Sequence, residues 1–301
     1  MSHRWQHILE RLHEKNGLQR WVCRKMIGMT QRFGISICGN HFYEPIPDIR
    51  DIASNYDENP RVLHWFCPTL RWEANASEIL CGYLQEYVAS ATYARYKRNW
   101  FYDGWDAAYY YCFIRTTKPQ RITEIGQGVS TEIAQAAMDL NLRDGHGGSI
   151  ISVDPYGRGV ESSRFTTILR KRLEDIDDEV RSELLRTDVL FIDSTHVVKW
   201  NSDVTRLLQT WIPEVPINTA VHIHDIFTPY DYPKEWMVDA KRFWNEQYLV
   251  EAFLAFNSSF TVECPIHYLW RTGGLPRVAK QIGVADEVKP SGAAFWLRRT
   301  A

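Results

Sequence analysis

The sequence predicts an α/β fold with a doubly wound, mostly parallel sheet over residues 119–301, preceded by a mainly helical part over residues 1–118. Three observations predict this fold. From residue 119 onward, short apolar runs alternate with segments of helical periodicity, which is typical of a parallel sheet covered by helices on both faces. A glycine-containing turn at 126–128 follows the first apolar run and precedes a helical segment. The last two apolar runs come after the final long helical segment, which favours an antiparallel edge.

The elements of the second part are predicted from its periodicity. The expected strands are 121–125, 149–154, 164–169, 188–193, 219–227, 260–264 and 293–298. The helices between them are expected near 130–140, 174–186, 203–211 and 237–256.

The first 118 residues have a different pattern. Residues 3–33 carry apolar residues at helical spacing, interrupted by glycines. Residues 40–52 contain two prolines and are predicted to be extended. Residues 75–97 are predicted to be helical, with Asn75 or Ser77 as the N-cap. We therefore expect a helical cap that packs against another part of the chain, although its apolar residues would equally serve a homodimer interface.

Composition excludes several classes of protein. The 301 residues are 45% hydrophobic and 24% charged, which is typical of a globular chain. The formal net charge of −2 provides no positive field for nucleic acid or an anionic membrane. No apolar run approaches the roughly 20 residues that span a bilayer. The six cysteines show no CxxC spacing, so we expect the reducing cytoplasm and neither a disulfide framework nor a zinc knuckle.

The glycine turn is the first candidate binding site. Gly126 and Gly128 follow a strand and precede a helix, whose first N–H groups are free to bind a ligand. Asp154 ends the second strand, where a carboxylate can accept both hydroxyls of a ribose. A dinucleotide fingerprint would need glycine at the position of Thr131. The pattern therefore indicates another nucleoside ligand, and a plain βα loop is the alternative reading.

A second candidate site lies at the ends of two later strands. Asp193 ends the fourth strand, and His196 follows three residues later. His222 and His224 lie on one face of the fifth strand, and Asp225 follows at its end. These groups could supply a general base near neutral pH, expected to be His224 or His196 with Asp193, or a metal site. We expect His222, one position inside the strand, to be a core residue.

Aromatic residues form a third feature: ten of the 23 residues from 91 to 113 are Tyr, Trp or Phe. Core packing is the favoured explanation. The functional alternative is an aromatic wall for a planar substrate or for a sulfonium cation. In that reading Trp105 and Asp106 would contact the substrate.

Several segments resemble a known family. EIGQGVST at 124–131 resembles the E-x-G-x-G-x-S-T motif of class I S-adenosylmethionine-dependent methyltransferases. Other segments are similar to a bacterial, small-molecule methyltransferase-like group: HFYEPIPD (41–48), DVLFIDSTHVVKWNSDV (188–204), VHIHDIF (221–227), YPKEW (232–236), RFWNEQYLVEAFLAFN (242–257) and AAFWLRR (293–299).

The resemblance implies a Rossmann-like domain with S-adenosylmethionine as cofactor. It implies Asp154 at the ribose and Asp175 near the adenine amino group. The other cofactor-binding positions it implies are Glu124, Gly126, Gln127, Gly128, Ser130, Thr131 and Asp193. Residues of the substrate site or cap would be His41, Tyr43, Trp105, Asp106, Asn245 and Tyr248.

A metal site is a further implication. Metal-dependent O-methyltransferases place an acid at the end of strand four and a ligand pair at the end of strand five, which here would be Asp193 with His224 and Asp225. Their usual pair consists of oxygen donors, so His224 makes Mn²⁺, Fe²⁺, Zn²⁺ or no metal as compatible as magnesium.

We expect methyl transfer to a hydroxyl or amine of a small molecule in secondary metabolism. One alternative keeps the cofactor but forms a cyclic amino acid of the azetidine-2-carboxylate type and releases methylthioadenosine. Another is a non-catalytic subunit that binds the cofactor as a ligand.

Overall fold

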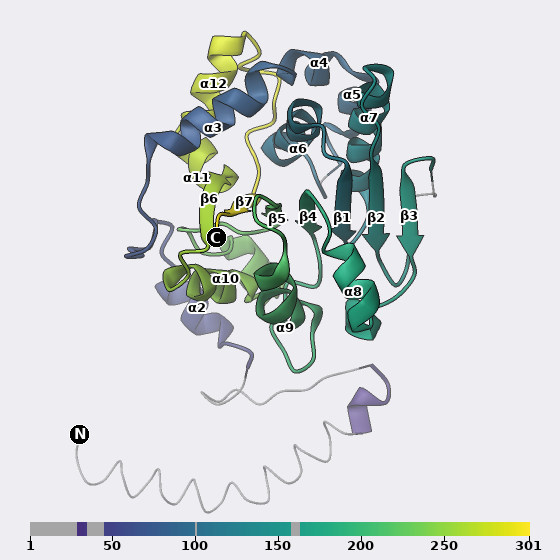
Figure 1. Ribbon diagram of the computed structural model, residues 1–301. Coiled ribbons are helices and arrows are strands. Elements are labelled where there is room, and N and C mark those ends of the chain that lie inside the picture. Colours follow the sequence, from purple (N-terminus) through teal and green to yellow (C-terminus); the bar gives the residue numbers. More distant parts are fainter. Residues whose placement is uncertain (1–28, 35–44, 100, 158–162) are drawn as a thin grey trace, which may run out of the picture. The chain divides into compact units, whose positions relative to one another are not determined.

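A computed structural model describes residues 29–34, 45–99, 101–157 and 163–301. It contains a seven-stranded sheet in the order β3-β2-β1-β4-β5-β7-β6 (Figure 1). The strands are β1 (Arg121–Ile125), β2 (Ser149–Val153), β3 (Thr166–Leu169), β4 (Val189–Ile192), β5 (Ala220–Ile223), β6 (Phe260–Pro265) and β7 (Phe295–Arg299).

Five strands are parallel and the last two form the antiparallel edge that the sequence predicts. In register, β1 pairs Ile122 with Ile150 of β2 on one side and with Val189 of β4 on the other. Strand β7 runs antiparallel to both β5 and β6. The predicted Rossmann-like α/β fold is therefore confirmed, and all seven predicted strands exist with small shifts at their ends.

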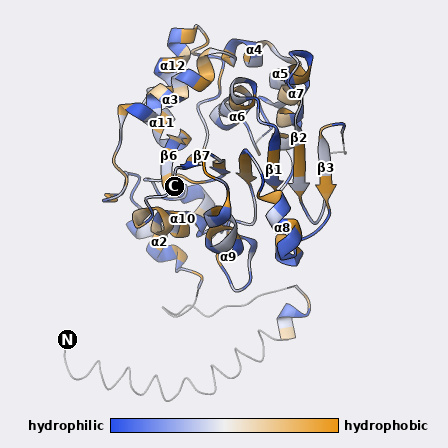
Figure 2. Cartoon of the chain, in the orientation of Figure 1, coloured by the Kyte–Doolittle hydropathy of each residue, from blue (hydrophilic) through white to orange (hydrophobic). Residues whose placement is uncertain are grey.

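The helices cover both faces of this sheet. Because parallel crossovers are right-handed, α7, which leads from β1 to β2, lies on the opposite face from α8 and α9, which lead back toward β4 and β5. Figure 2 shows hydrophobic colour on much of β2 and β3 and hydrophilic colour on much of α8. These helices are α6 (Gly104–Thr117), α7 (Val129–Arg143), α8 (Asp178–Leu184), α9 (Asp203–Arg206) and α10 (Glu246–Ala255).

Helix α6 contains five of the ten aromatic residues of the run over 91–113. Tyr109, Tyr110 and Tyr111 are at most 1% exposed, and Phe113 stacks on Trp296 of β7 at 4.6 Å between ring centroids. Core packing, the favoured explanation, is therefore confirmed for this helix.

His222 is also a core residue, as expected. It is fully buried in β5, and its ring stacks on Phe191 of β4 at 4.1 Å and an interplanar angle of 4°. The Tyr102 hydroxyl lies 3.3 Å from its Nε2. Burial lowers the pKa of His222 well below its ordinary value, so the ring is neutral near pH 7.

The long helix predicted over 75–97 is wrong. The chain forms α3 (Leu70–Cys81), α4 (Leu84–Ala89) and α5 (Ala91–Tyr96) instead. Thr69 is the N-cap of α3, since its hydroxyl accepts from Arg71 N at 3.2 Å, so neither Asn75 nor Ser77 is a cap. The extended backbone of Ser90 ends α4, and its side chain caps α5.

Other predicted boundaries also move. The helix predicted over 237–256 is divided into one π-helical turn, η4 (Glu235–Asp239), and α10, because Asn245 has non-helical dihedral angles. The region 174–186 forms η1 (Leu173–Asp175) and then α8, and the region 203–211 continues from α9 into η2 (Leu207–Trp211). The short turn η3 (Ile212–Glu214) follows.

The segment predicted as extended over 40–52 is helical from residue 49, in α2 (Ile49–Asn55), which Asp48 caps. The predicted helix over 3–33 lies mostly outside the described residues. The C-terminal part adds α11 (Ile266–Arg271) and α12 (Gly274–Ile282).

The chain divides into two compact units. One comprises Met1–Tyr56 with Pro233–Phe243, and in it α2 packs against η4. The other comprises Asp57–Tyr232 with Trp244–Ala301 and contains the sheet together with α3 to α6. The expected division into a cap over 1–118 and a domain over 119–301 stays a prediction. Among the described helices, none is long and apolar enough to cross a membrane.

Candidate functional site

A pocket of about 480 Å³ opens at the carboxyl ends of β1, β2 and β4. In parallel sheets this edge is where ligands bind, at the point where the strand order reverses. The order of this sheet reverses between β1 and β4, so the pocket occupies that position. Its walls include Gly126, Asp154, Tyr156, Leu173, Glu174 and Asp193.

Gly126 allows the strand ends to meet beneath the pocket. Its φ is +87°, and a Cβ at this position would lie 1.9 Å from the carbonyl oxygen of Asp193. Only glycine, which has no Cβ, can occupy a position this close to the Asp193 carbonyl group. Gly128 has an extended φ of 170° and open space around its Cβ position, so the turn requires only one of the two glycines.

Glu124 is completely buried just before this turn. The Tyr110 hydroxyl donates a hydrogen bond to its Oε1 at 3.1 Å, whereas Oε2 has no partner among the described residues. Burial raises the pKa of this carboxyl to about 7. Ser130 and Thr131 are buried at the start of α7, and Gly128 N donates to the Thr131 hydroxyl at 3.2 Å. An unsatisfied carboxylate oxygen therefore lies beside a helix N-terminus.

Asp154 is held at the end of β2 by backbone donors. Its Oδ1 accepts from Tyr156 N and Gly157 N, both at 2.7 Å, and its Oδ2 accepts from Gln127 N at 3.2 Å. These bonds fix the carboxylate on the pocket wall, which is the position expected for a ribose-binding acid.

Asp175 does not line the pocket and is exposed. Its neighbour Glu174 lines the pocket and pairs with Arg172 at 2.8 Å. Both acids lie in the same short turn η1. The sequence could not show which of the two acids faces the pocket, because the conformation of the turn sets the direction of each side chain.

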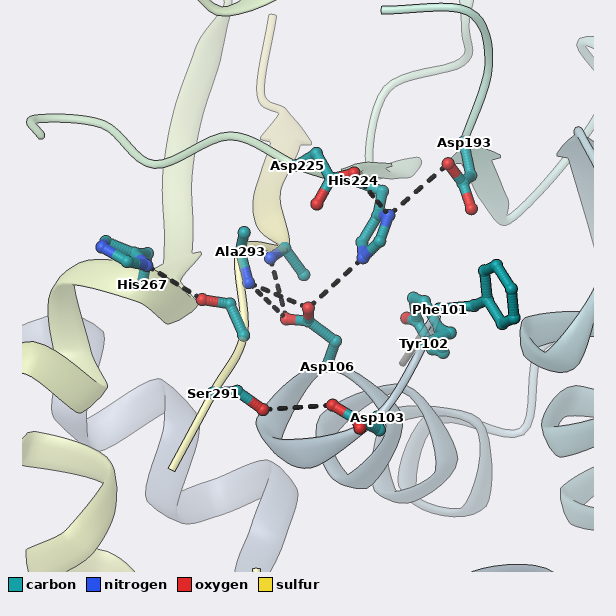
Figure 3. Close-up of polar contacts among 12 residues, drawn as sticks. Phe101, Tyr102, Asp103, Asp106, Asp193, His224, Asp225, His267, Ser291 and Ala293 are labelled. Carbon is teal, nitrogen blue, oxygen red and sulfur yellow. Dashed lines mark hydrogen bonds and ion pairs between the residues drawn. The ribbon is translucent and has the colours of Figure 1, made fainter. Parts of the chain in front are cut away.

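The predicted acids and histidines of β4 and β5 do converge. The Asp193 Oδ1 atom lies 3.3 Å from His196 Nε2 and 3.4 Å from His224 Nδ1. The Asp225 Oδ2 atom lies 3.5 Å from His224 Nδ1 and 3.8 Å from His196 Nε2. Figure 3 shows His224 between Asp106 on one side and Asp193 and Asp225 on the other. We call Asp193, His196, His224 and Asp225 the acid–histidine cluster.

Each imidazole of the cluster has another carboxylate on its far nitrogen. His196 Nδ1 lies 2.9 Å from Glu246 Oε2, and His224 Nε2 lies 3.4 Å from Asp106 Oδ2. Glu246 is fully buried at the start of α10, and Asp106 is 4% exposed. From the sequence, Glu246 is one of several polar residues over 242–248 that are expected to face either the pocket or the cap, and it is not paired with a histidine. The available signal is an acid directly after Asn245 at the start of a mostly apolar helix.

The electrostatics do not favour either histidine as the expected general base. Burial lowers the pKa of His196, but Asp193 and Glu246 outweigh it and raise the pKa to about 10. The carboxylates around His224 likewise raise its pKa well above the ordinary value despite burial. Burial raises the pKa of the Asp225 carboxyl, whereas the two histidines hold the pKa of Asp193 low. Of the two carboxylates in the cluster, Asp225 therefore has the higher pKa and is the stronger base.

Two cluster residues adopt left-handed backbone conformations. The φ of His196 is +59° and that of Asp225 is +57°. Such angles cost free energy in residues other than glycine and persist where the surroundings enforce them. Here they turn the side chains at the strand ends toward each other.

The cluster does not have the geometry of a metal centre. Within the described ranges, no group of three or more His, Cys, Asp or Glu side chains is arranged to hold an ion. The four side chains instead contact one another as imidazole–carboxylate pairs 3.3–3.8 Å apart. A metal bound by Asp193, His224 and Asp225 stays a prediction, and no reaction step below depends on it.

The expected substrate residues are dispersed. The Asn245 side-chain oxygen accepts from Val198 N at 2.6 Å and thereby supports the loop after β4. The Tyr248 hydroxyl donates to Asp231 at 2.6 Å. Trp105 is 2% exposed and belongs to the core. Within the part of the chain that the structure describes, none of these residues lines the pocket. His41 and Tyr43 lie outside the described residues.

A comparison with known protein families matches the segment that contains the pocket and the acid–histidine cluster. Residues 123–226 match a family described as "Methyltransferase domain". The matched segment begins in β1 and ends after β5, so it contains the pocket turn and the whole acid–histidine cluster. An uncharacterized protein of Archaeoglobus fulgidus is 29% identical over an alignment of 155 residues, and the match covers 46% of this chain and 68% of that protein.

Solved structures that resemble this chain have a lower sequence identity to it. The Podospora anserina methyltransferase PaMTH1, bound to SAH, is 14% identical with a TM-score of 0.41, covering 78% of this chain and 99% of that one. CmcI in a form with Mg and SAM is 16% identical with a TM-score of 0.38, covering 65% and 71% of the two chains. The fold assignment rests on the strand order of the present chain.

Gly126→Ala is expected to destabilise the protein by at least about 2 kcal/mol, because the methyl group would meet the Asp193 carbonyl in a conformation that disfavours alanine. Gly128→Ala is the matched control and should change the free energy of unfolding by no more than about 0.5 kcal/mol. Urea unfolding of both variants measures the difference. Equal losses would contradict the steric argument.

The histidine charges predict how stability depends on pH. Because the pKa of His196 is about 10 in the folded chain and about 6.5 when unfolded, its protonation stabilises the fold. This stabilisation is complete below about pH 6.5 and is lost as the pH rises through about 10. In His196→Phe, which keeps a ring against Trp244, the free energy of unfolding should fall less between pH 7 and 10 than in the wild type. Parallel curves would refute a charged His196.

Proposed function

We propose that this chain is an S-adenosylmethionine-dependent methyltransferase that acts on a small molecule. The observation that carries the proposal is the pocket at the reversal point of the sheet, with Gly126 at its base and carboxylates from β2 and β4 on its walls. The family match over 123–226 supports it, because that segment supplies each of these groups.

The pocket suits the three parts of the cofactor. The methionine end would lie beside Gly126 and Asp193, where the first N–H groups of α7 follow the glycine turn. Asp154 would accept from the ribose hydroxyls. The adenine would lie against Leu173 and Glu174. The volume of about 480 Å³ is within the usual range of roughly 300–1,000 Å³ for small-molecule pockets.

The acid–histidine cluster would act on the acceptor. In methyl transfer, a lone pair of the acceptor attacks the methyl carbon, the carbon–sulfur bond breaks, and S-adenosylhomocysteine leaves. The acceptor loses a proton, which Asp225 is placed to take. A hydroxyl or amine fits this chemistry, and we infer O- or N-methylation in secondary metabolism. A cytoplasmic location, the lack of nucleic-acid and membrane partners, and a homodimer stay predictions from the sequence.

Mass spectrometry of the purified protein with S-adenosylmethionine tests the reaction. Formation of S-adenosylhomocysteine only when an amine, a phenol or a cell extract is added supports methyl transfer. Methylthioadenosine with a cyclic amino acid, formed without any acceptor, would refute it in favour of the cyclase. Binding of the cofactor without turnover in any extract would favour the non-catalytic subunit.

Asp154→Asn is expected to weaken cofactor binding about 10- to 100-fold, because hydrogen bonds to a charged group contribute roughly 1.5–3 kcal/mol. Asp175→Asn is the matched control and should leave the affinity unchanged, since Asp175 lies outside the pocket. Isothermal titration calorimetry with S-adenosylmethionine measures both. Loss of affinity in Asp175→Asn alone would place the cofactor differently.

Asp225→Asn is expected to lower kcat about 10²- to 10⁴-fold with little change in cofactor affinity, because the amide cannot accept the proton. The exposed Asp286, changed to Asn, provides a control for the loss of one carboxylate. Steady-state kinetics and calorimetry separate the two effects. An unchanged kcat in Asp225→Asn would remove Asp225 from the mechanism.

A further inference from the structure

Asp106 connects three separate parts of the fold. It lies in the first turn of α6 and is 4% exposed. Its Oδ1 accepts from Ala293 N at 3.0 Å and Ala294 N at 2.8 Å, directly before β7. Its Oδ2 accepts from Ala293 N at 2.8 Å and lies 3.4 Å from His224 Nε2. Figure 3 shows this carboxylate between the chain at Ala293 and the His224 ring.

Two glycines bring the backbone this close to Asp106. A Cβ at Gly292, whose φ is +149°, would lie 2.9 Å from Asp106 Oδ1. A Cβ at Gly104, whose φ is +59°, would lie 2.7 Å from the carbonyl oxygen of Ser291. The start of α6 and the chain before β7 are therefore in direct contact, and Asp106 has little freedom to move.

A carboxylate in this position requires a proton on the His224 nitrogen that faces it. An ionised carboxylate only accepts hydrogen bonds, so the His224 atom that faces it, Nε2, must be a donor. The Tyr102 ring, with its centroid 5.0 Å from that of His224, covers the imidazole. The other nitrogen, Nδ1, then faces Asp193 and Asp225.

We propose that Asp106 is a positioning residue, which keeps His224 protonated on Nε2 and directs Nδ1 toward Asp193 and Asp225. It acts through His224 and does not contact the substrate, in contrast to the expectation from the sequence. The effect of Asp106 on turnover rests on the proposed methyltransferase function. Its effect on the protonation of the His224 ring is independent of that function.

Asp103 provides a matched control for a purely structural role. It lies immediately before α6 and binds the same C-terminal segment, through Lys289 Nζ at 2.7 Å and Ser291 Oγ at 3.1 Å. No contact joins it to His224 in the described part of the chain. If Asp106 only anchored this segment, Asp103→Asn and Asp106→Asn would have similar effects.

Asp106→Asn is the informative substitution. With its amide oxygen in the place of Oδ1, the side chain still accepts from Ala293 N and Ala294 N, while its NH₂ group takes the place of Oδ2 and gives up only the second bond from Ala293 N. This group donates, so the facing Nε2 of His224 must become an acceptor. The substitution is therefore expected to remove the proton from His224 Nε2 and leave a neutral ring that is protonated on Nδ1, while the chain remains folded.

Nitrogen-15 NMR of protein labelled at histidine tests this without any enzyme assay. The His224 signals are assigned by their loss in His224→Gln. Wild type and Asp103→Asn should show a protonated Nε2 at pH 7, and Asp106→Asn should show an unprotonated one. An unchanged His224 signal in folded Asp106→Asn overturns the proposal. If that variant does not fold, the wild type still decides, because an unprotonated Nε2 there also overturns it.

Kinetics then test the consequence for catalysis. We expect kcat of Asp106→Asn to fall about 100-fold, as for a misplaced catalytic group, with the dissociation constant for S-adenosylmethionine changed less than about threefold. Asp103→Asn should keep kcat. Equal kcat in wild type and Asp106→Asn, together with the NMR change, would refute a role in turnover. Absence of any methyl transfer in the wild type would refute the proposed function and leave the NMR result standing.

Discussion

The pairing of buried charges at the carboxyl ends of β4 and β5 is the constraint on which the site depends. Unpaired charges away from water cost several kcal/mol each, so the buried rings of His196 and His224 are stable as cations only beside the carboxylates that surround them. The pairing has consequences beyond the strands. It requires left-handed backbone at His196 and Asp225, and it requires carboxylates from α6 and α10 on the far nitrogens of both imidazoles.

Helix α6 connects this charged cluster to the hydrophobic core. One part of the helix, with Tyr109 and Tyr110, packs on the sheet, and its first turn presents Asp106 to His224. Tyr110 also donates to Glu124 on the cofactor side. The same helix therefore stabilises the fold and orders polar groups at both candidate sites, so substitutions in its core-facing residues should be interpreted with both roles in mind.

The protonation of the cluster changes the roles that its residues can have. A histidine near neutral pH is usually the first candidate for a general base, and the sequence favoured His224 or His196 on that ground. With two imidazoles among four carboxylates, each ring is instead held as a cation. In the proposed mechanism, the proton of the acceptor is therefore taken by the carboxylate whose pKa is raised by burial, which is Asp225. Only the number of carboxylates around each ring, a property of the tertiary structure, determines this exchange of roles.

The sequence by itself determined the sheet and the position of its site. The alternation of apolar runs and helical segments predicts all seven strands, because a strand that is buried on both faces appears in the sequence as a short run of apolar residues. The ends of these runs mark the ends of the strands. The site residues that lie there could therefore be identified from the sequence: Gly126, Asp154, Asp193 and Asp225. Helix boundaries over 75–97 and 237–256 were wrong, since Thr69, Ser90 and Asn245 end or begin helices through particular hydrogen bonds and dihedral angles. Only the tertiary structure decided that Glu174 and not Asp175 lines the pocket and that Asp106 and Glu246 face the two histidines. These contacts join residues that are far apart in the sequence, up to the 118 positions between Asp106 and His224. The two side chains meet only because α6 packs on the sheet, so no local sequence pattern could predict their contact.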